Sequence, residues 1–231
     1  RYIFQTEGLV IGYDEPLSRS ITISMERGEK IALVGANGIG KTTLLKSILG
    51  LIPSLQGSVE LGENLQVGYF EQEAERDSDI TALDYFWKEF PSMENRECRL
   101  CLSKCGLTND HITSQMRVLS GGENAKARMA VVMNREHNWL ILDEPTNHLD
   151  ISAKEIVEEF LLEFPGTVFM VSHDRYLLDS VCTRTIVLEE QKLMSYLGNY
   201  SYYRQKAAEL ERIAREKQEA LEAEQARKQA N

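Results

Sequence analysis

A glycine-rich segment, GANGIGKT at residues 35–42, contains residue types that predict a specific chemistry. It follows an apolar run at 30–35 that is typical of a strand, and it leads into a helical pattern at 41–50. Glycines let backbone N–H groups point inward around phosphate oxygens, and the helix start adds partial positive charge. Lys41 would reach the β- and γ-phosphates of a nucleotide, and the Thr42 hydroxyl would ligate Mg²⁺. The segment therefore predicts a site for a magnesium nucleotide.

Two carboxylates follow a continuous apolar run, WLIL, at residues 139–142. Such a run is typical of a buried parallel strand, and ligands bind at the carboxyl ends of these strands. Asp143 is placed there to hold Mg²⁺, directly or through water, and Glu144 is placed to polarise a water aimed at the γ-phosphate. Pro145 ends the strand because proline cannot donate to a strand ladder. Beside the glycine-rich segment, this pair predicts nucleotide hydrolysis.

A third segment, LSGGE at residues 119–123, has a serine and two adjacent glycines before a helical pattern at 124–134. The start of that helix is a second place where backbone N–H groups would face phosphate. One nucleotide does not obviously need two such helix starts from one subunit. We therefore expect a composite site, in which this segment serves a nucleotide held by another domain.

The elements that must position these residues alternate between strand and helix patterns. Strand patterns occur at 9–13, 21–25, 30–35, 57–61, 65–70, 139–143, 167–172 and 184–188. Helical patterns occur at 41–50 and 124–134, and residues 73–118 are charged and helical in character. This alternation favours a mostly parallel sheet with crossover helices. From residue 204 the composition shifts to Ala, Glu, Lys, Arg and Gln, which favours a solvated helical tail over a partner-binding helix.

Length, composition and charge restrict the class of protein. The chain has 231 residues, enough for one sizeable α/β domain, and 42% of them are hydrophobic. No apolar run approaches the roughly 18 residues of a membrane-spanning helix, so we expect no direct membrane insertion. The net charge of −10 argues against the chain as a whole wrapping nucleic acid. Because the first residue is Arg1, we interpret the chain as a piece of something longer.

The four cysteines do not predict a secreted disulfide framework, and a reducing cytosol fits them better. Cys98, Cys101 and Cys105 are spaced as C-x₂-C-x₃-C, which would suit a metal or cluster, yet a fourth ligand is missing nearby. The same spacing places all three on one face of a helix that ends before Gly106. We therefore expect these cysteines to be core thiols.

An ordered set of motifs gives the sequence its resemblance to a known family. The three segments above are accompanied by Tyr13, by Gln72 after a strand, by LD at 149–150 and by SHD at 172–174. Together they resemble the ATP-binding cassette (ABC) ATPase domain over roughly residues 5–190. The resemblance implies an α/β fold of the P-loop NTPase class, with a mixed, mostly parallel core sheet, an antiparallel β subdomain and a small helical subdomain.

The resemblance also implies a division of the chain and a role for each matching residue. The ABC ATPase domain would span 1–203, with the helical subdomain at about 73–129, and a charged helical extension would follow at 204–231. Lys41, Glu144 and His173 would be catalytic, with His173 holding the γ-phosphate and the attacking water's geometry. Thr42, Gln72 and Asp143 would form the Mg²⁺ site. The implied ATP contacts are Tyr13 (stacked on adenine), Gly35, Asn37, Gly38, Gly40, Lys41, Thr42, Thr43, Gln72, Ser120, Gly121, Gly122 and Asp150, the last four serving the opposite site or the dimer interface.

Three further stretches narrow the resemblance to the ABC-F subfamily. They are EPTNHLD at 144–150, SHDRYLLDSV at 172–181 and YLGNYSYY at 196–203. The resemblance to the second ABC domain of these proteins implies a cytoplasmic location, a second ABC domain as partner, and action on the ribosome in translation or antibiotic resistance. Because this chain has one P-loop and one LSGGE segment, either two copies pair head to tail or a missing half completes the sites. His148 would cap or brace its loop.

Two alternatives share the catalytic residues. The first is the ATPase subunit of a membrane ABC transporter, whose transmembrane partner would dock near Gln72, with 73–118 as the coupling surface. The TNHLD motif and the charged tail count against it. The second is a DNA-associated ABC ATPase with the tail as its contact, although the seven Lys and Arg of residues 204–231 are nearly balanced by six Asp and Glu.

Overall fold

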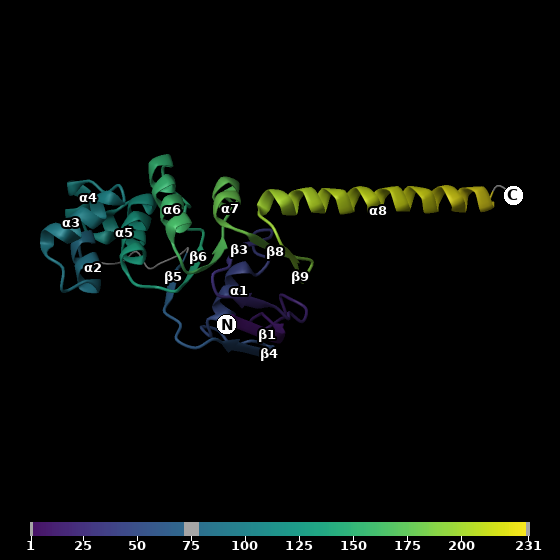
Figure 1. Ribbon diagram of the computed structural model, residues 1–231, viewed down its shortest axis with the longest axis horizontal. Coiled ribbons are helices and arrows are strands. Elements are labelled where there is room, and N and C mark those ends of the chain that lie inside the picture. The colour runs from purple at the N-terminus through teal and green to yellow at the C-terminus, as the bar shows by residue number, and fades with distance from the viewer. Residues whose placement is uncertain (1, 72–78, 230–231) are drawn as a thin grey trace.

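A computed structural model describes residues 2–71 and 79–229 of the protein, with side chains to residue 225. A central body carries a group of short helices at one end, and a long C-terminal helix extends away at the other (Figure 1). No helix among these residues is long and apolar enough to cross a membrane. The predicted site residue Gln72 lies outside the described residues.

The main sheet contains six strands in the described chain, in the order β5-β6-β7-β3-β8-β9. All neighbours are parallel except β8 and β9, so the predicted mostly parallel sheet is confirmed. The predicted strand patterns missed β9, an edge strand with few buried residues and therefore no clear apolar pattern. The strands are β3 (Lys30–Val34), β5 (Val67–Phe70), β6 (Trp139–Asp143), β7 (Thr167–Val171), β8 (Arg184–Glu189) and β9 (Lys192–Tyr196).

Strand β6 is apolar without interruption because both faces of the sheet are covered. Leu140 and Leu142 pack in a cluster with residues of α5 (Gly121–Asn134), α6 (Ile151–Glu163) and α7 (Arg175–Val181). Trp139 and Ile141 point the other way, into a cluster that includes α1 (Lys41–Ile48) and the second sheet. A strand buried on both faces positions its last residue, Asp143, firmly at the sheet edge.

The second sheet is antiparallel, in the order β2-β1-β4, and matches the antiparallel β subdomain that the family resemblance implies. Its strands are β1 (Tyr2–Val10), β2 (Ser24–Glu26) and β4 (Gln56–Leu61). The strand predicted at 9–13 therefore begins earlier and ends at Val10. Thr6 is buried although it is polar, so residues 5–7 form a polar run in the sequence that hides the strand, and Gly8 has a positive φ of 60° where the register shifts.

Most helices of the body begin at a polar N-cap that the sequence makes visible. Thr81, Thr108, Ser120, Asp150 and Asp174 each accept a hydrogen bond from a backbone N–H in the first turn of the following helix. The group at one end of the body is formed by α2 (Ala82–Glu89), α3 (Asn95–Lys104), α4 (Asn109–Thr113), a 3₁₀ turn η1 (Met116–Val118) and α5. We call these elements the helical group. It has its own apolar cluster, joined to the body through α5.

The three clustered cysteines are packing residues of the helical group, as predicted. Cys98 and Cys105 are buried and Cys101 is half-buried, and all are free thiols. Within the described residues, no cluster of three or more His, Cys, Asp and Glu could hold a metal ion. Gly106, with a φ of 91°, follows the end of α3 in the left-handed conformation that favours glycine.

The C-terminal helix α8 (Tyr200–Gln229) starts on the body and then leaves it. At its root, the Ser201 backbone N–H and hydroxyl donate to the Asp179 carboxylate at 2.7 and 2.5 Å, and Tyr200 packs against Tyr203. Farther along, Leu210 and Leu221 are exposed, and Figure 1 shows the helix extending beyond the body. The helical tail predicted from residue 204 is thus the continuation of a helix that begins at Tyr200.

Candidate nucleotide site

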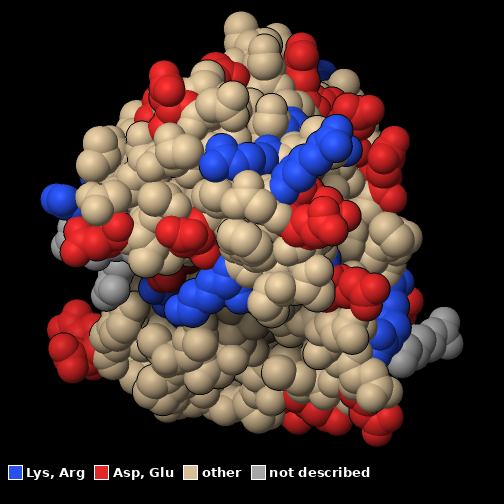
Figure 2. Space-filling view, turned by 90° about the vertical axis from the view of Figure 1, so that its left-hand side faces the viewer, with Lys and Arg blue, Asp and Glu red and all other residues tan. Residues whose placement is uncertain are grey.

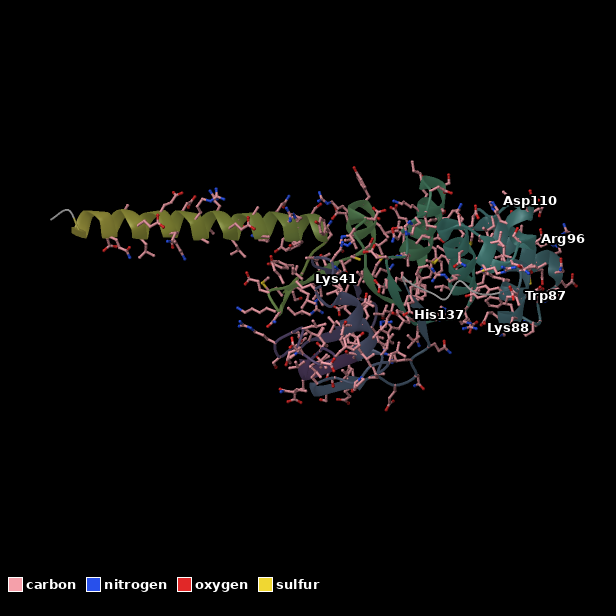
Figure 3. All side chains as sticks on the ribbon, turned by 180° about the vertical axis from the view of Figure 1, so that it is seen from behind. Lys41, Trp87, Lys88, Arg96, Asp110 and His137 are labelled. Atoms are coloured by element: carbon pink, nitrogen blue, oxygen red, sulfur yellow. The ribbon has the colours of Figure 1, made fainter. Side chains whose placement is uncertain are left out.

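The glycine-rich segment wraps around the end of α1 and holds Lys41. The Lys41 Nζ donates to the carbonyl oxygens of Gly35 at 2.6 Å and Ala36 at 2.8 Å. Burial lowers the pKa of Lys41, and the Glu144 and Asp143 carboxylates act against that shift. Figure 3 shows Lys41 in the body, far from Arg96 and Asp110 at the end of the helical group. The two carbonyl groups therefore fix the Lys41 ammonium group beside the loop backbone, where the Glu144 and Asp143 carboxylates act on it.

Two glycines give this loop its shape. Gly38 and Gly40 have φ angles of 75° and 112°, a region that side-chain-bearing residues rarely adopt. Gly35 meets a different constraint, because a Cβ there would lie 2.6 Å from the Leu188 carbonyl oxygen. The spacing of glycines in the motif thus follows from the backbone path of a loop that turns its N–H groups inward.

Asp143 combines burial with one unpartnered oxygen. The Thr42 hydroxyl donates to Asp143 Oδ2 at 2.7 Å, whereas Oδ1 is buried and has no hydrogen-bond partner. The residue is 1% exposed, and burial raises the pKa of its carboxyl group. A buried carboxylate oxygen without a partner carries a free-energy penalty that a bound cation would remove. The hydroxyl and carboxylate pair therefore fits the oxygen donors that Mg²⁺ prefers.

Glu144 meets His173 and Asn37 at the same edge of the sheet. The His173 ring Nε2 lies 3.3 Å from Glu144 Oε1 and 2.9 Å from Asn37 Oδ1. Burial raises the pKa of the Glu144 carboxyl group, and the adjacent His173 opposes that rise. Glu144 has a positive φ of 52°, an unusual backbone conformation for a glutamate. A carboxylate with a raised pKa beside a histidine is suited to accept a proton from water.

These side chains line one cavity of about 550 Å³. The structure therefore brings together residues for which the sequence predicted catalytic, phosphate-binding and metal-binding roles. Leu17, Asn147 and Val171 also line the cavity and were not predicted as site residues. Asn147 lies in the TNHLD stretch, which indicated the subfamily but predicted no catalytic role for this residue. The predicted residues in the lining are Asn37, Gly38, Gly40, Lys41, Thr42, Thr43, Asp143, Glu144 and His173.

Other predicted contacts lie off this cavity. The Tyr13 side chain is 62% exposed and does not line it, so its stacking on adenine stays a prediction. Ser120 caps α5 through a reciprocal pair of hydrogen bonds with Glu123, and Gly121 and Gly122 form the first turn. Asp150 caps α6. The LSGGE segment is thus a separate feature of the chain, as a composite site requires.

Comparisons with known proteins place this geometry among nucleotide-binding domains. Residues 18–147 match the family model described as ABC transporter. The chain is 54% identical over 185 residues to the uncharacterized ABC transporter ATP-binding protein YfmM of Bacillus subtilis, covering 80% of this chain and 36% of that protein. It is 40% identical to ABC transporter F family member 2 of Arabidopsis thaliana, covering 93% of this chain and 33% of that protein. The chain therefore spans about a third of the length of these relatives.

A solved structure supports the fold. It is described as a dimeric structure of a post-hydrolysis state of the ATP-binding cassette MJ0796 bound to ADP and Pi. The likeness has a TM-score of 0.72 at 19% identity and covers 84% of this chain and 98% of that chain. The predicted fold class is confirmed by this likeness. The resemblance to the ABC-F subfamily is confirmed by the F-family relatives.

Replacing Lys41 with alanine is expected to remove nucleotide binding. The change deletes a cation that faces two carboxylates and the predicted phosphate position, so we expect the affinity for ATP to fall by about 100-fold or more. Isothermal titration of ATP into Lys41→Ala measures this loss. Lys217→Ala, on the exposed part of α8, serves as a control with the same chemical change. Unchanged affinity in Lys41→Ala would contradict the phosphate role.

Replacing Glu144 with glutamine is expected to separate binding from turnover. The amide keeps the shape of the side chain but cannot accept a proton, so kcat should fall by about 10²–10⁴-fold while ATP affinity is retained. Steady-state phosphate release and nucleotide titration measure the two effects. Glu159→Gln, exposed on α6, is the matched control. Hydrolysis by Glu144→Gln at the unmodified rate would show that the base is another group.

Proposed function

Because the chain belongs to the ABC transporter family and is an ATP-hydrolysing domain of it, we propose that it is one half of an ABC-F protein whose two ABC domains close on ATP. The observation that carries this proposal is the separation of the two sets of site residues. The P-loop, Asp143, Glu144 and His173 share one cavity, whereas Ser120–Gly122 lie outside it. A complete site then needs the LSGGE segment of a second domain.

The residues of the cavity supply the steps of hydrolysis. Lys41 would exchange its contacts with the Gly35 and Ala36 carbonyls for the β- and γ-phosphate oxygens. Glu144 would take a proton from the water that attacks the γ-phosphorus, and the bond to the β-phosphate oxygen would break to give ADP and phosphate. His173 would hold the γ-phosphate and the geometry of the attacking water. Thr42 and Asp143 would hold Mg²⁺, which neutralises phosphate charge when bound.

The useful output of this chemistry is the closing and opening of two domains. The start of α5 offers backbone N–H groups at Gly121 and Gly122, together with the positive end of a fourteen-residue helix, to a γ-phosphate held elsewhere. Each ATP would then join the P-loop of one domain to the LSGGE segment of the other. Hydrolysis would remove the γ-phosphate from this bridge and release the two domains.

We propose that the target of this switch is the ribosome in the cytoplasm. The support is the ABC-F resemblance of the TNHLD, SHDRYLL and GNYSYY stretches and the F-family relatives. Figure 2 shows, on the face that carries the helical group, Lys and Arg scattered among Asp and Glu rather than gathered in one patch. The support for the ribosome is therefore the family resemblance and not a basic patch on this face.

We retain the division into an ABC domain at 1–203 and a tail at 204–231 as a proposal. Tyr200 and Tyr203 at the root of α8 pack against the body, and the helix beyond them is exposed. The side chains of the first turn belong to the domain although the backbone helix is continuous.

Ribosome association should depend on the nucleotide. In the full two-domain protein, Glu144→Gln and the equivalent change in the other domain should hold ATP in the closed state. We expect this protein to co-sediment with ribosomes in ATP but not in ADP. In the control, Lys41→Ala and the equivalent lysine change in the other domain are added to this protein. Co-sedimentation with ribosomes in ATP should then be lost. If the two domains close in ATP but the protein does not co-sediment with ribosomes, the ribosome is not the target, and a membrane protein or DNA becomes the expected partner.

A further inference from the structure

The Glu123 carboxylate, at the end of the LSGGE segment, makes two contacts. Its Oε2 accepts the Ser120 backbone N–H at 2.9 Å, and its Oε1 lies 3.3 Å from Nε2 of His111 on α4. The hydrogen bond from Ser120 lowers the pKa of the Glu123 carboxyl group, and the nearby His111 acts in the same direction, against the effect of burial. The carboxylate is therefore ionised at neutral pH, and a histidine from a different helix faces its second oxygen.

A backbone contact determines which nitrogen of His111 carries the proton. The Thr108 backbone N–H donates to His111 Nδ1 at 3.2 Å, as part of the capping box that begins α4. Because Nδ1 is an acceptor, the proton of the neutral imidazole must lie on Nε2. Nε2 is the nitrogen beside Glu123. The ring therefore presents an N–H group to the carboxylate without needing a positive charge of its own.

Helix α4 is anchored in the helical group and can hold this ring in place. Ile112, next to the histidine, is 1% exposed and packs in the apolar cluster of the helical group. At the end of α4, the Ser114 carbonyl oxygen accepts the Ala82 N–H at 3.0 Å, which joins α4 to the start of α2. Figure 3 labels Asp110, directly before His111, at the end of the molecule far from Lys41. The histidine therefore acts on the LSGGE segment and does not line the phosphate cavity of its own domain.

The capping box around Glu123 decides which donors of the LSGGE segment can reach a phosphate. The Ser120 N–H is taken by Glu123, and Ser120 Oγ accepts the Glu123 N–H at 3.2 Å. Because Oγ is an acceptor there, the hydroxyl hydrogen is left as a donor. Gly121 and Gly122 lie in the first turn of α5, where N–H groups have no intrahelical partner. A γ-phosphate would then meet one hydroxyl and two N–H groups, with the negative charge of Glu123 in the same turn.

We propose that His111 is a positioning residue of the ATP site that this chain completes for the other domain. It holds the Glu123 carboxylate on the Ser120 N–H, which keeps that charge from turning toward the γ-phosphate and keeps the Ser120 hydroxyl in place. This inference rests on the proposed head-to-tail pairing. ADP lacks the phosphate that the LSGGE segment would bind. A change at His111 should therefore affect closure in ATP and leave the binding of ADP unchanged.

The test uses the two-domain protein with Glu144→Gln and the equivalent change in the other domain, so that bound ATP is retained. His111→Glu keeps a standard capping box with Thr108 but places a second carboxylate beside Glu123. Because like charges at this range repel, the ATP concentration for half-maximal closure, followed by small-angle X-ray scattering, should rise about tenfold. ADP makes no contact with the LSGGE segment, so its affinity in isothermal titration should change by less than about twofold.

A compensating change distinguishes positioning from a general loss of packing. Glu123→Gln keeps the capping box with Ser120, and its amide NH₂ can donate to the carboxylate introduced at position 111. The combined variant, His111→Glu with Glu123→Gln, should therefore close within about threefold of the original ATP concentration, although it carries two changes. Asn109→Glu adds a carboxylate at the exposed first position of α4. It is the control and should close at the original concentration.

Three results would contradict the role of His111. They are closure of His111→Glu at the original ATP concentration, an equal loss of ADP affinity, or a combined variant that closes no better than His111→Glu alone. If the protein without the His111 change closes in ATP, these results remove the positioning role and leave the head-to-tail pairing intact. If that protein does not close in ATP, the pairing fails, and the role of His111 fails with it.

Discussion

The buried carboxylate of Asp143 is the constraint on which the rest of the site depends. Its Oδ2 is satisfied by Thr42 and its Oδ1 by nothing in the described chain. Burying a carboxylate without full compensation costs several kcal/mol, an order-of-magnitude figure for such groups. The Asp143 carboxylate stays in this position because β6 lies between β5 and β7 and is covered on both faces. A magnesium nucleotide would satisfy the free oxygen, so the site is preorganised for this ligand.

The same strand end also separates the two regions of the chain that we propose take part in catalysis. Glu144 leaves β6 with a left-handed φ and turns toward His173 across the sheet edge. The loop then leads to Asp150, which caps α6 and does not line the cavity. Helix α5 packs on this loop and carries the LSGGE segment outward. The segment thus lies outside the cavity of its own P-loop, which agrees with its proposed role at another domain's nucleotide.

Much of this arrangement could be predicted from the sequence because it follows from local patterns. The P-loop needs its glycines for backbone reasons, and β6 is apolar throughout because it is buried on both faces. Asp143, Glu144 and His173 were expected at one sheet edge because each ends or follows a strand. The N-caps at Ser120 and Asp150 also correspond to short polar signals before helices.

Other features depend on contacts between distant residues and carry no local signal. The Lys126–Asp150 pair joins residues 24 apart, and the approach of Gly122 to His148 joins residues 26 apart, so neither follows from a motif. The left-handed conformation of Glu144 and His148 is imposed by the packing of their loop. Strand β9 was missed because it is an edge strand with an exposed surface. The first part of β1 was missed because Gln5, Thr6 and Glu7 form a polar run in the sequence, although Thr6 is buried.

Two double variants of the two-domain protein test directly whether each ATP site is split between the two domains. One combines Lys41→Ala with Gly121→Asp in this domain, and the other pairs Lys41→Ala here with the matching glycine change in the other domain. If the sites are split, the first variant loses both sites, and the second keeps one site and about half of the ATP turnover. The reverse result, with turnover kept by the first variant and lost by the second, would mean that each domain contains a complete site of its own.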